Sequence, residues 1–311
     1  MKATRFKTWI SKWLIERPAD RLHLSRDHVR GLWFLAPLFG FIGLLILVPV
    51  LGTVVDGFFR DIVYLPIRFV FLNNYRYLAA DPDFWTAVRF SGLFVLVSVP
   101  LELVLGLGMA LVLNEPMPLR GPMRACVLIP WAVPAAVTGR VFQLIYNYSY
   151  GAANYMLGLL HITHQPFNWL GSDLSAFLAL TAGDTWQTTP FAAIILLAGL
   201  AAIPEELYAQ AKVDRAGLWR RFRYITLPLL KPVLVVALLF RTVQALRIFD
   251  IIFVLTGGGP GGATQSLSML AYRHFSAGDF GYGSAASVVL FLMALGVSIL
   301  YVRAGRFMEG G

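Results

Sequence analysis

Six apolar stretches of membrane-spanning length constrain the fold of this chain more than any other feature. A helix rises about 1.5 Å per residue, so about 20 residues cover the roughly 30 Å of bilayer hydrocarbon. The stretches lie near residues 32–55, 90–113, 125–146, 174–200, 232–256 and 284–302. Hydrophobic residues make up 58% of the 311 positions and charged residues 14%, which excludes a soluble domain of this size. The sequence predicts an all-α membrane protein with six transmembrane helices.

The distribution of Lys and Arg predicts the orientation in the membrane. Of the 26 basic residues, 18 lie in segments 1–30, 114–124 and 203–231 and in the tail after residue 302. The segments that face the opposite side carry only Arg60, Arg68, Arg76 and Arg273. Cytoplasmic loops are enriched in basic residues, so we expect both termini and segment 203–231 to face the cytoplasm. The net charge of +9 then needs no nucleic-acid surface to explain it.

The first 30 residues are interpreted as a basic cytoplasmic arm, followed by a transmembrane domain over residues 31–311. A signal peptide is the alternative for this region. The apolar stretch after the arm is longer than the hydrophobic part of a signal peptide, and no small-residue cleavage pattern follows it. We therefore expect it to be retained as the first span.

Several kinds of chemistry have no support in the sequence. The single cysteine, Cys126, excludes an intrachain disulfide and makes a metal cluster implausible. The glycine-rich run at 257–262 is not followed by the Gly-Lys-Ser/Thr of a phosphate-binding loop. Without a zinc-protease motif or a credible catalytic triad, the chain is predicted not to be an enzyme and to bind no metal.

Polar residues occur inside the fourth predicted span, where they are energetically expensive. Asp184, Trp186 and Gln187 lie together at mid-depth. Carboxyl, indole and amide groups all bind hydroxyl groups, so these three residues are predicted to line a cavity for a hydroxyl-rich solute. The alternative is hydrogen bonding between helices, which we favour for Thr188 and Thr189.

The fifth predicted span carries a polar residue at every third position: Arg241, Gln244, Arg247 and Asp250. At about 100° per residue this stripe turns by about 60° at each step, so all four side chains cannot face one pore. Gln244 is predicted to contact solute. Arg247 and Asp250 either belong to the same pathway or form a structural ion pair, because helix neighbours three positions apart can meet.

The polar segment 203–231 is predicted to form a helix-turn-helix on the membrane surface. Pro204 followed by Glu205 and Glu206 is typical of a helix start, since proline lacks a donor and the acids favour the positive end of the helix dipole. The run from Asp214 to Gly217 interrupts this helix before a second apolar face begins. An amphipathic helix resting on anionic lipid is the simpler alternative.

The same segment resembles the coupling loop, or EAA loop, of binding-protein-dependent ABC importers. The shared pattern is proline, two acids, an alanine-rich turn, Asp-x-Ala and then Ile-x-Leu-Pro. Thr-Pro-Phe in the fourth span, and Arg-x-Phe-Asp with a Thr-Gly-Gly-Gly-Pro loop, extend the resemblance over roughly residues 125–302. These motifs are similar to the larger-partner class of maltose, trehalose and glycerol-phosphate importers.

The resemblance implies a type I ABC importer transmembrane domain whose loop docks on an ATPase. The residues it assigns to this coupling are Glu205, Glu206, Ala211, Asp214, Arg215, Gly217, Leu218 and Trp219. Two positions depart from the pattern: Ala209 and Gln210 replace the usual Glu-Ala, and Arg215 replaces the usual glycine. Because a non-glycine residue is strained at positive φ, we expect either a turn that is not left-handed or Gly217 in that role.

The resemblance also implies partners: a second homologous permease, two ATPase subunits that bind ATP and magnesium, and an external solute-binding protein. The chain itself is expected to bind no cofactor and to span the cytoplasmic (inner) membrane. Its expected function is translocation of a sugar, such as the disaccharides trehalose or maltose. The alternatives are an importer of a polyol or sugar phosphate, and an ion-coupled secondary transporter that uses the intramembrane Arg and Asp.

Overall fold

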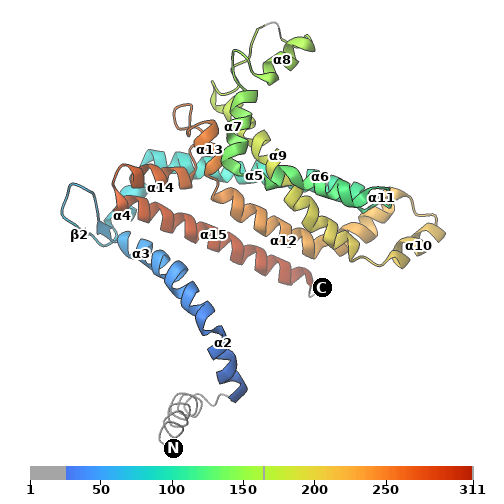
Figure 1. Ribbon diagram of the computed structural model, residues 1–311, viewed down its shortest axis with the longest axis horizontal. Coiled ribbons are helices and arrows are strands. Elements are labelled where there is room, and N and C mark those ends of the chain that lie inside the picture. The colour runs from blue at the N-terminus through green and yellow to red at the C-terminus, as the bar shows by residue number, and fades with distance from the viewer. Residues whose placement is uncertain (1–25, 164, 310–311) are drawn as a thin grey trace, which may run out of the picture. The chain divides into compact units, whose positions relative to one another are not determined.

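The structure is a computed structural model that describes residues 26–163 and 165–309 (Figure 1). It divides into two units, Met1–Val55 and Asp56–Gly311. In the first unit, helix α2 (Arg26–Ile42), a π-helical turn η1 (Gly43–Leu47) and α3 (Val48–Asp56) follow one another directly. Its stretch Trp33–Asp56 is long and apolar enough to cross a membrane. Most of the predicted N-terminal arm lies outside the described residues.

The second unit begins with a small subdomain of two strands and a helix. Strands β1 (Phe59–Arg60) and β2 (Arg68–Phe69) pair antiparallel, and helix α4 (Asn73–Ala80) follows them. Asn74 fastens the helix to the first strand, because its side-chain amide donates to the carbonyls of Gly57 at 3.0 Å and Phe59 at 2.8 Å.

Helices α5 (Pro82–Asn114) and α9 (Asp173–Ala201) form the centre of the bundle and correspond to the second and fourth predicted spans. Asp81 caps α5 by accepting from the backbone of Asp83, and Ser172 and Ser175 form a capping box on α9. The two helices touch at Gly106, where an added Cβ would lie 3.1 Å from the Cβ of Ala192. The absence of a side chain at Gly106 permits this close approach of the two helices.

The third predicted span, near residues 125–146, is not one continuous helix but a bent pair of helices that passes as one span only when taken together. Helices α6 (Arg120–Ala132) and α7 (Ala135–Ile145) meet at an angle of 86°. Pro134 explains the break, since proline disfavours helical geometry in the residue before it, and Val133 is extended with ψ 129°. Beyond the break, α7 and then α8 (Ala152–Leu159) project away from α5, α12 and α15 (Figure 1).

Helix α12 continues across residues 231 and 232, where the sequence predicts the boundary between the coupling loop and the fifth span. After a 69° bend from α9, helix α10 (Glu205–Val213) forms the first half of the loop. Then α11 (Leu218–Arg221), the π-helical turn η2 (Phe222–Thr226) and α12 (Leu227–Leu246) form one 29-residue helical segment. The π-helical turn η2 ends at Thr226, two positions before Pro228. In a regular α-helix the ring of Pro228 would clash with the carbonyl four positions earlier, and the wider turn relieves that clash.

The fifth span ends at Leu246 and not at residue 256 as predicted. A break of three residues precedes helix α13 (Asp250–Leu255), and a glycine-rich loop leads to α14 (Leu267–Ser276) and α15 (Phe280–Glu309). The hydroxyl of Ser266 donates to the carbonyl of Ile248 at 2.7 Å, so a backbone group freed by the break is satisfied inside the protein. In the described residues, four helices are long and apolar enough to span a membrane, or six if each bent pair is one span.

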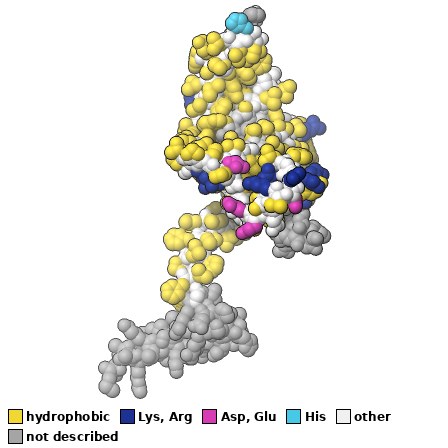
Figure 2. Space-filling view, turned by 90° about the vertical axis from the view of Figure 1, so that its right-hand side faces the viewer, with side chains coloured by type: hydrophobic (Ala, Val, Ile, Leu, Met, Phe, Trp, Pro, Cys, Tyr) yellow, Lys and Arg dark blue, Asp and Glu magenta, His cyan; other side chains and the backbone are white. Residues whose placement is uncertain are grey.

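Two hydrophobic clusters line the inside of the α5, α9 and α12 bundle. One includes Phe94, Leu180 and Ile252, the other includes Leu196 and Leu230, and Leu103 on α5 packs against both. On the outside, hydrophobic side chains cover most of the face drawn in Figure 2. Lys and Arg gather in a band on this face, at the end where α10 and α11 lie in Figure 1.

The first prediction tests the orientation with single cysteines in a Cys126→Ser background. Gly217→Cys is expected to react with a membrane-impermeant maleimide only from the cytoplasmic side, and Tyr155→Cys only from outside. Tyr155 is 71% exposed, whereas the neighbouring Asn154 holds its segment together and should be left intact. Labelling from the reverse sides would overturn the orientation that the basic residues predict.

Candidate functional site

Arg241 on α12 is the centre of a buried charge network. Its Nε donates to the carboxylate of Glu102, its Nη2 donates to Asp184 at 3.3 Å, and its Nη1 donates to the side-chain oxygen of Gln244 at 2.6 Å. Arg241 is 2% exposed and Glu102 is fully buried. A buried charge without partners is strongly destabilising, so each member of this network depends on the others.

The network joins three helices that are far apart in the sequence. Glu102 comes from α5, Asp184 from α9, and Arg241 from α12. The guanidinium group has several donors in a fixed plane, so it can bind both carboxylates and Gln244 at the same time. The relative positions of the three helices are therefore set by specific polar contacts as well as by apolar packing.

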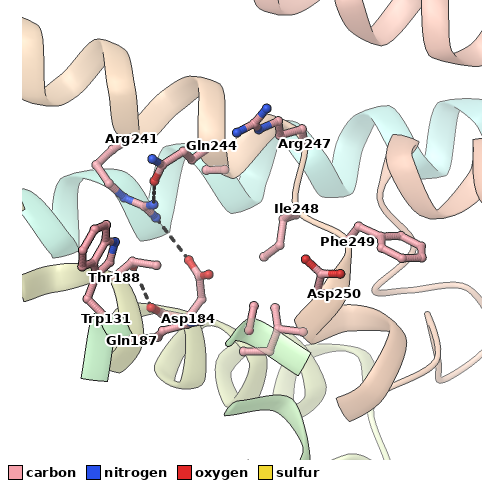
Figure 3. A pocket seen from close by; sticks show the side chains of 13 residues that line it. Trp131, Asp184, Gln187, Thr188, Arg241, Gln244, Arg247, Ile248, Phe249 and Asp250 are labelled. Carbon is pink, nitrogen blue, oxygen red and sulfur yellow. Dashed lines mark hydrogen bonds and ion pairs between the residues drawn. The ribbon is translucent and has the colours of Figure 1, made fainter. Parts of the chain in front are cut away.

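A pocket of about 300 Å³ opens beside the network, and we call it the central pocket. Figure 3 shows Asp184, Gln187 and Thr188 on one side and Arg241 and Gln244 on another, with Arg247 to Asp250 along the break. Its lining comes from α6, α7, α9, α12, α13 and the break: Trp131, Ala135, Asp184, Gln187, Thr188, Arg241, Gln244, Ala245, Arg247, Ile248, Phe249, Asp250 and Ile251. Charged, amide and aromatic groups thus converge on one space.

The two glutamines of the central pocket are oriented in opposite senses. Gln187 donates its amide to the carbonyl of Val133 at 2.7 Å, which satisfies a backbone group at the break between α6 and α7. Gln244 instead accepts from Arg241 through its oxygen. Among the described residues, two groups keep no partner: the side-chain oxygen of Gln187, an acceptor, and the side-chain NH2 of Gln244, a donor.

Arg247 and Asp250 do not form the ion pair that the sequence left open. No ion pair is found for either residue within the described part of the chain, and both are exposed at the central pocket. An ion pair between Arg247 and Asp250 requires a continuous helix. Helix α12 instead ends at Leu246, and Arg247 has φ −98° and ψ 20°. The two residues are therefore not neighbours on one helix face.

Five of the six predicted pathway residues line the central pocket, and Trp186 does not. Its ring lies edge-on against Phe142, 5.8 Å between centroids, and the side chain is 46% exposed. Helix α9 continues through Pro190, so Trp186 points about 200° away from Asp184, while Gln187 and Thr188 return to the same face. The indole at the pocket belongs to Trp131. Thr188 and Thr189 bond carbonyls of their own helix instead of another helix.

The turn of the coupling loop is left-handed at Arg215, contrary to both expectations. Arg215 has φ 54°, whereas Gly217 has φ −66° and precedes α11. Ala216 donates to the carbonyl of Ala211 at 2.8 Å, and Arg215 donates to that of Lys212 at 3.0 Å. These two bonds form a Schellman motif at the end of α10, with arginine in the position that usually holds glycine.

The coupling residues form an exposed surface with an apolar anchor beneath it. Leu218 is 80% exposed and Trp219 71%. Below them, Leu207 and Ile225 pack against the cluster around Leu196, and the hydroxyl of Tyr208 lies 2.9 Å from that of Thr226. Seven of the eight predicted coupling residues are exposed, namely Glu205, Glu206, Asp214, Arg215, Gly217, Leu218 and Trp219, and Ala211 is half-buried.

Comparison with known proteins identifies the family. Residues 102–309 match the family described as binding-protein-dependent transport system inner membrane component. The chain belongs to this family. It is therefore a multi-pass permease subunit of an ABC transporter, and not itself an enzyme.

Relatives of the permease cover nearly its whole length. It is 48% identical to the trehalose/maltose transport system permease protein MalF of Thermococcus litoralis, over 91% of this chain and 95% of that protein. It is 41% identical to the sulfoquinovosyl glycerol transport system permease protein SmoG of Agrobacterium fabrum, over 90% and 91%. A bacterial ABC transporter for import of the acidic polysaccharide alginate shares the fold, with a TM-score of 0.75, 21% identity, and coverage of 90% and 97%. The permease thus has the predicted type I importer fold.

Trp131 at the pocket and Glu102 in the charge network are not predicted from the sequence. For Glu102 the sequence does contain a signal. It is the only charged residue in the apolar stretch 90–113, and an ionisable group at that depth is itself a sign of a buried partner. Polar residues inside the second predicted span therefore indicate a site in the same way as those inside the fourth and fifth spans. The partner of Glu102 could not be predicted, because Arg241 lies 139 positions later.

The second prediction concerns the charge network. Arg241→Met leaves two buried carboxyl groups without their cation and is expected to destabilise the permease by about 3 to 5 kcal/mol. The amount of folded permease recovered from membranes should fall, and adding Glu102→Gln and Asp184→Asn should restore part of it. Arg247→Met is the matched control, because Arg247 is exposed, and its recovery should equal wild type. Equal recovery of the Arg241 and Arg247 variants would contradict the network's structural role.

The third prediction concerns the strained turn. Arg215→Gly is expected to stabilise the closed turn by about 1 kcal/mol, because glycine adopts positive φ without the steric penalty. Hydrogen exchange of the backbone amides of residues 215 and 216 should then slow by roughly fivefold. Gly217→Ala should leave exchange unchanged, since its φ is negative and nothing lies within 4 Å of the added Cβ. Faster exchange in Arg215→Gly would refute the Schellman assignment.

Proposed function

We propose that this permease translocates a sugar, and specifically a disaccharide such as trehalose or maltose, in an ATP-driven import complex. The observation that carries the proposal is the chemistry of the central pocket. A sugar hydroxyl both donates and accepts hydrogen bonds, and the pocket offers a free acceptor on Gln187 and free donors on Gln244. Carboxylate, guanidinium and indole groups complete a lining suited to a hydroxyl-rich solute.

The named relatives support the choice of a disaccharide. The relative at 48% identity is a trehalose/maltose permease, and one at 38% identity is the trehalose permease SugA of Mycobacterium tuberculosis. A polyol or sugar phosphate is the second candidate. The observation that favours it is Arg247, an exposed cation at the central pocket that could bind an anionic group.

Exposed charges support the presence of a second permease subunit. Arg247 and Asp250 face the central pocket, and Arg140 on α7 bonds only Gln143 of its own helix among the described residues. Charged groups within membrane spans rarely face lipid and usually face a protein or a wet cavity. We infer that a second, homologous permease covers this face and completes the solute pathway.

Energy coupling is assigned to the exposed surface of the coupling loop. In the proposed complex, two ATPase subunits bind ATP and magnesium on the cytoplasmic side, and an external solute-binding protein delivers the sugar. The helical segment from Leu218 to Leu246 begins in the coupling loop and ends at the central pocket. Its 29 residues span about 43 Å, so movement of the loop by the ATPase would be transmitted directly to Arg241 and Gln244.

The proposed location is the cytoplasmic (inner) membrane. Both termini, and with the N-terminus the arm at residues 1–30, would lie in the cytoplasm. The distribution of basic residues supports this orientation. An ion-coupled secondary transporter is not retained, because the chain belongs to a family of binding-protein-dependent transport systems.

The fourth prediction tests solute binding in the central pocket. Asp250 has no ion-pair partner in the described residues, so Asp250→Ala should leave folding intact while removing a charged acceptor from the pocket. Loss of a hydrogen bond to a charged group corresponds to roughly 10- to 150-fold in solute affinity. Uptake of labelled trehalose and maltose by proteoliposomes that contain the complete complex should fall, while basal ATPase activity is retained.

Asp173→Ala is the matched control for this test. Asp173 is an exposed acid at the start of α9 and does not line the central pocket. Its variant should transport at the wild-type rate. If Asp250→Ala also transports at that rate, the solute does not contact the break between α12 and α13. If the wild-type complex transports neither disaccharide, the proposed solute class is wrong.

A further inference from the structure

A second cavity, of about 690 Å³, lies at the other end of the bundle, and we call it the loop cavity. Its walls come from the end of α5, the end of α9, helix α10 and the start of the segment at Leu218. Apolar side chains form most of them, including Leu111, Leu200, Trp219 and Phe222. The loop cavity shares no lining residue with the central pocket, so the solute pathway does not account for it.

Basic groups stand at the polar side of the loop cavity. Lys212 and Arg221 line it, against a single acid, Glu115. The Nε of Arg221 is buried and has no hydrogen-bond partner in the described residues. The guanidinium of Arg221 therefore has hydrogen-bonding capacity that the described residues do not use.

The ends of the helices place the loop cavity at the edge of the membrane. Helix α5 ends at Asn114, and the guanidinium of Arg120 donates to the carbonyls of Leu113 at 3.0 Å and Asn114 at 2.6 Å. Arg124 donates to Leu113 as well. Arginines that satisfy the last carbonyls of a span are typical of the boundary between hydrocarbon and water, so we infer that the loop cavity lies at this boundary.

We propose that the loop cavity binds one anionic phospholipid, with its phosphate against Lys212 and Arg221 and its acyl chain along Leu111, Leu200 and Phe222. Basic pockets between spans on the cytoplasmic side suit the headgroups of anionic lipids, and the apolar walls distinguish a lipid from free phosphate. The loop cavity shares Leu218 and Trp219 with the coupling surface, so the lipid would lie against that surface between α10 and α5. This inference rests on the cytoplasmic orientation proposed above.

The test is native mass spectrometry of the complete transporter with added dioleoyl phosphatidylglycerol or dioleoyl phosphatidylcholine. The wild-type complex should retain one phosphatidylglycerol per permease and prefer it over phosphatidylcholine. Inorganic phosphate should not displace the lipid. Lys212→Gln with Arg221→Gln should weaken phosphatidylglycerol binding by roughly 30-fold, at about 1 kcal/mol for each basic residue near an anionic headgroup.

Two further variants distinguish a specific lipid-binding site from general attraction between basic residues and anionic lipid. Arg223→Gln with Lys231→Gln removes the same charge from the same segment but touches no part of the loop cavity, so its lipid binding should match wild type. Leu111→Trp narrows the cavity without changing charge and should also lose the lipid. Equal losses in the two double variants, or full binding in Leu111→Trp, would overturn the proposal.

Two other results would also overturn it. One is the absence of any preference for phosphatidylglycerol in the wild-type complex. The other is a cross-link from Leu111→Cys to an ATPase subunit in place of lipid, which would make a segment of that subunit the occupant. Cysteine labelling and sugar uptake on the same preparations report the orientation and the proposed function separately. Failure of the lipid site therefore leaves those conclusions unaffected.

Discussion

The contact of one guanidinium group with two carboxyl groups is the interaction on which the rest of the permease depends. Arg241, Glu102 and Asp184 are supplied by three different helices and are buried together. Apolar side chains allow helices to slide and rotate against one another in lipid, because lipid is as apolar as the helix surface. A buried charged contact permits far fewer arrangements, so it fixes the rotation of α5, α9 and α12 together. The central pocket owes its shape to that rotation.

Breaks in two spans give the pocket its polar lining without leaving backbone groups unpaired in the membrane. Gln187 satisfies the carbonyl of Val133 at the break between α6 and α7, and Ser266 satisfies that of Ile248 at the break between α12 and α13. Irregular backbone at membrane depth is tolerated where protein or a wet cavity supplies its partners. The same breaks bring Trp131 and Asp250 to the pocket, so the interruption of the helices is what gathers the polar groups.

The apolar spans, the family and five of the polar pocket residues could be predicted from sequence because they depend on composition and on local spacing. Apolar length fixes the spans, and polar residues inside them are conspicuous. The break at Leu246 could not be predicted in this way, since it is stabilised by Ser266, which is 18 positions from its acceptor. Trp186 was misassigned because residues close in sequence were assumed to share a face, although the helical period turns it away from Asp184. Arg215 shows a third case, in which local strain is tolerated because the hydrogen bonds that end α10 require a left-handed residue there.

The continuous helical segment from Leu218 to Leu246 restricts where residues can be inserted into this chain. One residue inserted into α12 before Arg241 would rotate everything beyond it by about 100° and advance it by about 1.5 Å. Arg241 would then face away from Glu102 unless the loop at the other end rotated by the same angle. Insertions are therefore expected to be excluded between the loop and the pocket. Gaps in an alignment of related permeases would map the rigid part of the molecule without any further structure.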